Sequence, residues 1–207
     1  MANANTPRGL SPVGTITGAA YNEQGRLYAI ANDASNTYAI GDVVKASAGS
    51  DANGVPYAIK AVTTDTPLGV VVGIRVSDPG VSLVGTTLAL NTIYLPLSSG
   101  TRYAYVVDDP NVIFEVEGDA TGVAAADVFK NAGLSITANQ TTLAMSAPLS
   151  NTVLNASSFL ASSASGSLAL PLQIIGLVQA VNNAPGAYAS ALVKWNKHQF
   201  LNPVGTA

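Results

Sequence analysis

The densest group of chemically active side chains is a run of five carboxylates within twelve residues: Asp108, Asp109, Glu115, Glu117 and Asp119. Clustered carboxylates bind Ca²⁺, and a carboxyl pair at a fixed separation can hydrolyse glycosidic bonds. The spacing does not match an EF-hand loop, however, and a β-strand would spread these groups by about 3.3 Å per residue. The favoured interpretation is therefore a turn at Asp108–Asp109 followed by a solvated strand face, with a metal site or a glycosidase as lesser alternatives.

The remaining residue types offer no complete catalytic set. His198 is the single histidine, and the chain contains no cysteine. A general base, a nucleophilic triad or a zinc site needs several such groups together. No Gly-x-Ser-x-Gly motif occurs, and Gly69 and Gly73 lie within a strand pattern and not in a phosphate-binding loop. We therefore expect no enzyme activity, no catalytic residues, no cofactor and no metal.

Two tyrosines deserve a separate interpretation. Tyr103 and Tyr105 are two residues apart and would share one face of a strand, as a stacking pair for sugar rings does. Tyrosine is also common in β-sheet cores and interfaces, which is the favoured interpretation. A carbohydrate-binding or adhesion module remains the alternative. Asn139-Gln-Thr141 and Asn155-Ala-Ser157 match the N-glycosylation pattern, which would have no meaning if the host is bacterial.

Charge and composition narrow the choice of partners. Hydrophobic residues make up 48% of the 207 residues and charged residues only 10%, against about 25% charged residues in typical soluble domains. The net charge is −3, and the nine basic residues are scattered, so we expect no nucleic-acid partner. Residues 168–181 form the most apolar stretch, which is interrupted by polar residues and too short to span a membrane. The N-terminus lacks the apolar core of a secretory signal, so we expect folding in the cytosol and no membrane partner.

Short alternating or apolar runs separated by turn residues predict an all-β chain. Paired strands are expected over 57–62 and 68–76, and a hairpin over 92–97 and 102–107. The run Val70–Val72 predicts burial on both faces, and Val112, Phe114 and Val116 predict the buried face of a strand. Only residues 123–131 predict a helix, ending before Gly133. Further strands are expected at 27–30, 37–40, 43–45, 168–181 and 190–195. The predicted fold is an antiparallel jelly-roll or β-barrel-like single domain with one short helix.

The chain divides into an extended N-terminal arm, residues 1–20, and a β-rich domain, residues 21–207. The arm is rich in Gly and Pro, and its apolar residues Leu10, Val13 and Ile16 are the predicted anchors to a neighbouring subunit. Residues 131–193 contain no charged residue or histidine. Within that stretch, a long Ser/Ala-rich loop is expected at about 150–167.

Several segments, taken in their order along the chain, resemble the head decoration, or cement, proteins of tailed bacteriophages. The resemblance spans nearly the whole chain, and residues 139–167 fit it least. The matching stretches are Met1-Ala-Asn-Ala-Asn5, Gly9-Leu-Ser-Pro-Val13, Gly41-Asp-Val-Val-Lys45, Asp51-Ala-Asn-Gly-Val-Pro56, Gly69-Val-Val-Val-Gly73, Arg102-Tyr103, Asp108-Asp-Pro110, Phe114-Glu-Val116, Ile175-Gly-Leu-Val178 and Leu192-Val-Lys-Trp-Asn-Lys-His-Gln199.

This resemblance implies a β-barrel or jelly-roll protein on the outer surface of the phage capsid. The protein would be made in the bacterial cytoplasm and form homo-oligomers, dimers or trimers, astride contacts between major capsid proteins. It would stabilise the mature shell by binding it preferentially. Another virion role, in the tail or baseplate, is compatible with the same composition.

Overall fold

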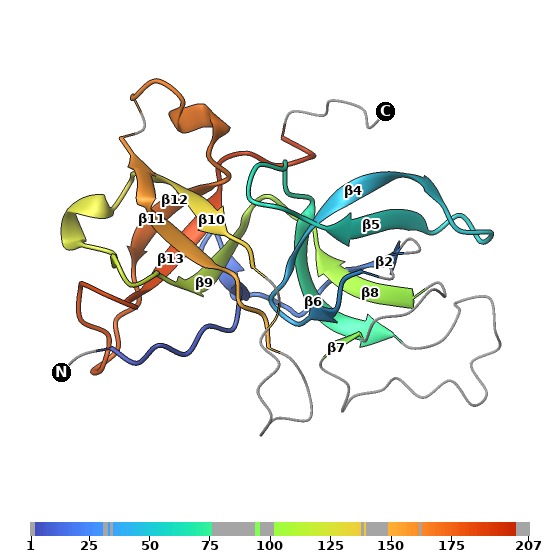
Figure 1. Ribbon diagram of the computed structural model, residues 1–207, viewed down its shortest axis with the longest axis horizontal. Helices are drawn as coiled ribbons and strands as arrows, with labels where there is room; N and C mark the ends of the chain where they lie inside the picture. The colour runs from blue at the N-terminus through green and yellow to red at the C-terminus, as the bar shows by residue number, and fades with distance from the viewer. Residues whose placement is uncertain are drawn as a thin grey trace.

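The computed structural model describes residues 3–30, 33, 35–75, 94–95, 102–137, 139, 149–161 and 163–201. The fold is all-β, with 47% of residues in strands and 4% in helical turns. A closed barrel and a six-stranded sheet lie side by side (Figure 1). The first strand, β1 (Ser11–Thr15), belongs to the sheet, and the chain returns from the barrel to the sheet between β8 (Arg102–Val107) and β9 (Val112–Glu117). No helix of the described residues is long and apolar enough to cross a membrane.

Five strands close the barrel in the order β2-β5-β4-β6-β8. They are β2 (Arg26–Ile30), β4 (Val43–Ser50), β5 (Pro56–Lys60), β6 (Gly69–Arg75) and β8 (Arg102–Val107). The β2–β5 pair is parallel and the other pairs are antiparallel. Beside the barrel, β3 (Tyr38–Ala39) pairs with β7 (Tyr94–Leu95).

The sheet has the order β1-β9-β13-β12-β10-β11 and is antiparallel throughout. Its strands are β1 (Ser11–Thr15), β9 (Val112–Glu117), β10 (Asn131–Ser135), β11 (Val153–Leu160), β12 (Leu172–Leu177) and β13 (Ser190–Trp195). Two short 3-10 helices, η1 (Ala125–Asp127) and η2 (Ser167–Ala169), lie in its connections.

The apolar run Val70–Val72, which predicted burial on both faces, lies in the wall of the barrel. One hydrophobic cluster fills the barrel, and a second lies between the sheet and the outside of the barrel. Because side chains alternate along a strand, neighbouring wall residues enter different clusters. This is seen for Val43 and Val44, Val70 and Val71, and Val106 and Val107. The two units are therefore joined by a shared apolar wall.

The helix predicted at residues 123–131 is wrong. Only Ala125–Asp127 is helical, and Asn131 already belongs to β10. The Asp127 carboxylate accepts the Ala124 N–H at 2.7 Å and closes a tight turn, and Phe129 has a positive φ of 67° that ends any helix. The Phe129 N–H then donates to the Ile174 carbonyl at 2.8 Å. Sheet pairing overrides the helix propensity of the alanine run.

Three further expectations need correction. The loop expected at about 150–167 contains β11, Val153–Leu160, whose small polar side chains suit the exposed edge of a sheet. The strands at 57–62 and 68–76 do not pair with each other, because β4 lies between them. Of the strand expected at 92–97, the structure describes only β7, Tyr94–Leu95, which pairs with β3, and no pairing with β8 occurs among the described residues. A closed barrel is present as predicted, whereas a jelly-roll is not confirmed.

The N-terminal segment is part of the fold. β1 is an edge strand that pairs with β9, with a bulge between Pro12 and Gly14. Leu10 is buried in the cluster between sheet and barrel. Further toward the N-terminus, the Thr6 N–H donates to the Glu117 carboxylate. Residues 3–15 therefore extend and contact the chain's own sheet, whereas the sequence predicted an arm that reaches a neighbouring subunit.

Candidate functional site

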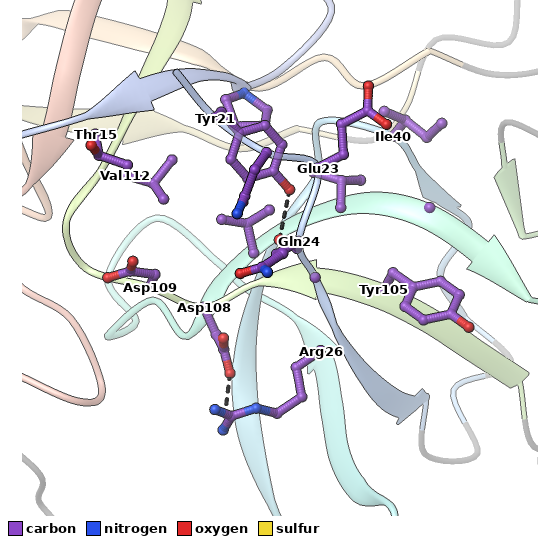
Figure 2. A pocket seen from close by; sticks show the side chains of 16 residues that line it. Thr15, Tyr21, Glu23, Gln24, Arg26, Ile40, Tyr105, Asp108, Asp109 and Val112 are labelled. Atoms are coloured by element: carbon purple, nitrogen blue, oxygen red, sulfur yellow. Dashed lines mark hydrogen bonds and ion pairs between the residues drawn. The ribbon is translucent and has the colours of Figure 1, made fainter. Parts of the chain in front are cut away.

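A groove of about 1080 Å³ lies between β1, the loop that follows it and the outer face of the barrel (Figure 2). Its walls come from Pro12 and Thr15 on one side and from Val72, Gly73 and Tyr105 on the other. The loop residues Tyr21, Glu23 and Gln24 project over it, and the Tyr21 hydroxyl donates to the Gln24 carbonyl at 2.7 Å. The groove thus combines aromatic rings with carboxylates and amides.

An ion pair closes the lower end of the groove in Figure 2. Arg26 lies 3.3 Å from the Asp108 carboxylate, which also accepts the Tyr28 hydroxyl at 2.6 Å. This hydrogen bond and burial raise the pKa of Tyr28 above its usual value, with burial the larger cause. Asp108 is therefore already engaged by two partners and is not a free general base.

The other carboxylates of the acidic run are also separated. Glu115 pairs with Arg8 at 3.7 Å, and Asp109 accepts the Asn111 N–H at 2.9 Å in its own turn. Asp119 accepts the N–H of Ala156 at 3.1 Å, which attaches the loop after β9 to β11. Among the described residues, no group of three or more His, Cys, Asp or Glu side chains is placed to hold a metal.

One of these carboxylates differs from its predicted environment. Glu117 was expected on a solvated face but is buried beneath the N-terminal segment. Burial raises the pKa of Glu117, and the Thr6 N–H and hydroxyl partly offset this shift. This contact was not predictable from the sequence, because Thr6 and Glu117 are 111 positions apart.

The two tyrosines of β8 have different roles. Tyr103 is buried, and its hydroxyl donates to the Asp51 carboxylate at 2.7 Å, so its ring is not available to stack on a sugar. Tyr105 is half-buried on the groove wall. The core interpretation is confirmed for Tyr103, and the groove residues Tyr21 and Glu23 were missed because nothing in the sequence marks a loop that folds over a barrel.

The three predicted anchors, Leu10, Val13 and Ile16, differ in burial. Leu10 is buried in the chain's own core, whereas the side chains of Val13 and Ile16 are 43% and 51% exposed. Val13 is the extra residue of the β1 bulge, and the Ile16 N–H donates to the Asn111 carbonyl at 2.9 Å. The backbone therefore holds the side chains of Val13 and Ile16 on the surface, and the buried Leu10 fixes that backbone to the core.

His198 is a core residue. It is fully buried, with ring centroids 5.5 Å from Trp195 and 5.6 Å from Phe200, and its Nδ1 accepts the Phe200 N–H at 3.2 Å. Burial lowers the pKa of His198 below its ordinary value of 6.5, and this is the largest contribution to the shift.

This burial predicts a pH dependence of stability. Below pH 6.5 the unfolded chain binds a proton at His198 that the folded chain binds only at a lower pH, so the free energy of unfolding should fall as the pH drops from 6.5 toward the folded-state pKa. The slope is at most about 1.4 kcal/mol per pH unit for one proton. Urea denaturation of the wild type and of His198→Gln over this range checks it, because the variant should lack that component. Parallel pH profiles for the two proteins would refute it.

Comparison of the chain with protein-family models, with curated proteins and with solved structures gave no match.

Proposed function

We propose that this chain is a structural decoration protein that binds the outer surface of a tailed-phage head and stabilises contacts between major capsid proteins. The observation that carries the proposal is the pair of exposed apolar side chains, Val13 and Ile16, on the edge strand β1. The sequence resemblance supplies the partner class. The low proportion of charged residues, 10%, suits a surface covered by other subunits.

The energetics of such a module follow from preorganisation. Leu10 and the β1–β9 pairing fix the backbone around Val13 and Ile16 before binding. A rigid apolar patch loses less conformational entropy on association than an arm that orders only when bound. Preferential binding to the mature shell then lowers the free energy of that state by mass action. We place homo-oligomers of the chain, dimers or trimers, on the outside of the capsid, after synthesis in the bacterial cytoplasm.

The test is binding to phage heads assembled without this protein. We expect the double variant Val13→Asp/Ile16→Asp to bind at least about tenfold more weakly, which corresponds to about 1.4 kcal/mol, because burying two carboxylates costs more than burying two apolar side chains gains. Val62→Asp is the matched control, since Val62 is 57% exposed in the turn after β5. Quantitative sedimentation and electron microscopy of the heads give the occupancy. Equal affinity of the double variant and the wild type would contradict the assignment of this surface, and undecorated heads with the wild type would contradict the function.

The groove favours a second candidate, a carbohydrate-binding module. Tyr21 and Tyr105 supply ring faces, and Glu23 supplies a carboxylate that can accept sugar hydroxyls. Glycan-array binding by the purified wild type, lost on Tyr105→Ala, would favour this function over capsid decoration.

A further inference from the structure

A buried lysine, asparagine and aspartate meet where the barrel contacts the segment that follows β10. Asp42 lies in the turn between β3 and β4, Lys60 ends β5, and Asn139 is the fourth residue after β10. The Asp42 side chain is 0% exposed and the Lys60 side chain is 8% exposed. Figure 1 shows the segment after β10 leaving the sheet toward the barrel.

Each of the three side chains contacts both others. The Lys60 Nζ donates to the Asn139 Oδ1 at 2.7 Å and to the Asp42 Oδ2 at 3.0 Å. The Asn139 Nδ2 donates to the same Asp42 Oδ2 at 2.8 Å. The Asp42 Oδ1 is buried and has no hydrogen-bond partner within the described part of the chain. An amine, a carboxamide and a carboxyl group are thus in mutual contact inside the protein.

We propose that Lys60 and Asn139 become joined by an amide bond, formed without a cofactor, with Asp42 moving the protons. In the first step, the Lys60 ammonium gives a proton to the Asp42 carboxylate, which leaves a neutral amine and a carboxylic acid. The amine is then a nucleophile with no water layer to displace.

The bond changes balance within the three residues. The Lys60 Nζ lone pair attacks the Asn139 Cγ, the carbon that carries the oxygen it contacts, while the Asp42 carboxyl group stays in contact with the Nδ2 group that is to leave. Asp42 then transfers a proton from Nζ to the Nδ2 group, the Cγ–Nδ2 bond breaks, and ammonia leaves. Asp42 returns to the carboxylate by giving its proton to the departing ammonia. The products are therefore a secondary amide between the Lys60 and Asn139 side chains, an ammonium ion and the Asp42 carboxylate.

Position supplies most of the rate that such a reaction needs. Groups held in contact react as if one were present at about 10⁵ M or more, and a carboxyl group at 2.8–3.0 Å from both nitrogens is within the range for general acid–base catalysis. The second lysine–aspartate pair, Lys45 with Asp65, has the same separation of 3.0 Å, but within the described part of the chain the Lys45 Nζ donates to no side chain other than Asp65. That pair is more exposed and serves as an internal comparison.

The consequence is a covalent connection between the two units. Lys60 belongs to the barrel, and Asn139 lies beyond the sheet strand β10, 79 positions further along the chain. A cross-link over such a long loop restricts the unfolded chain and resists separation of barrel and sheet under load. This inference does not depend on the proposed function.

Mass spectrometry of the purified full chain tests the proposal. We expect the intact mass to be lower than the sequence mass by one ammonia. Because a linked Lys60 resists trypsin, and because no Lys or Arg occurs in 131–193, digestion should release a branched peptide that joins residues 46–75 to residues 131–194. The branched peptide is the decisive readout, since a succinimide at Asn53-Gly54 would lose the same mass. Full sequence mass with separate peptides would overturn the proposal.

Variants separate the roles of the three residues. Lys60→Arg and Asn139→Ala should have no branched peptide, and Asp42→Asn should keep both partners but leave them unlinked. Lys45→Ala should retain the branched peptide, with its first arm extended to residues 27–75 because the trypsin site at position 45 is lost. If Asp42→Asn does not fold, Asn139→Ala still tests the bond. A branched peptide in Asp42→Asn would overturn the role of Asp42, and one in Asn139→Ala would overturn the assigned partner.

Discussion

Replacing Phe114 by alanine is expected to lower the free energy of unfolding by about 3–5 kcal/mol. Phe114 lies in β9, between β1 and β13, and is fully buried. Its ring contacts Trp195 edge-on, with centroids 5.4 Å apart. The substitution removes this contact and leaves a cavity that the surrounding strands cannot fill. Because a domain is stable by about 5–15 kcal/mol in total, the loss is a large fraction of the stability.

Chemical denaturation followed by the fluorescence of Trp195, the only tryptophan, measures this change. Ile113→Ala is the matched control, because Ile113 precedes Phe114 on the same strand but is only half-buried on the opposite face. We expect a loss of about 1 kcal/mol or less for the control. Similar losses in the two variants would mean that the apolar face of β9 is not the main contact between sheet and barrel.

The strand that carries Phe114 shows what the sequence was able to predict. Val112, Phe114 and Val116 alternate along the strand with Ile113, Glu115 and Glu117, and the structure buries the first three. The same local rule located most of the other strands. Strand partners were not predictable in this way, because pairing depends on residues far apart in the chain. β4 separates β5 from β6, although those two strands are consecutive in the sequence.

The division of the chain into a barrel and a sheet that pack together was also not predictable from the sequence. The run Val70–Val72 indicated burial on both faces, but not that the two faces belong to different clusters. The buried triad was less visible still. Asp42 reads as a turn residue and Asn139 as a glycosylation pattern, and 97 positions separate them. Only the folded chain brings such polar residues together, so their chemistry could not be inferred from spacing.

The integration of the N-terminal segment changes how the proposed interface must be tested. Removing residues 2–16 would delete β1 and the buried Leu10 along with Val13 and Ile16. Such a truncation would expose β9 and part of the core, and loss of binding would then follow from loss of structure. Point substitutions at the two exposed side chains leave the β1–β9 pairing in place, which is why they give the sharper test.

The attachment of that segment depends on two glycines in direct backbone contact. The Leu10 N–H donates to the Gly41 carbonyl at 3.0 Å, and the Gly41 N–H donates to the Val71 carbonyl at 2.8 Å. A Cβ on Gly41 would lie 2.1 Å from the Arg8 carbonyl oxygen, and one on Gly9 would lie 2.2 Å from the Gly41 carbonyl oxygen. Neither contact can be relieved by rotating a side chain, because both involve backbone atoms.

We therefore expect Gly41→Ala to lower the free energy of unfolding by about 2–5 kcal/mol, the sum of about 1–2 kcal/mol for a side chain at positive φ and about 1–3 kcal/mol for overpacking. Gly54→Ala isolates the first contribution, since Gly54 has a φ of +79° with nothing within 4 Å of an added Cβ. Denaturation of both variants gives the difference, which measures how tightly the N-terminal segment is held against the barrel. If Gly41→Ala loses no more stability than Gly54→Ala, residues 8–10 move away at little cost. Val13 and Ile16 would then belong to a loosely attached arm, and the preorganisation that supports the proposed interface would be lost.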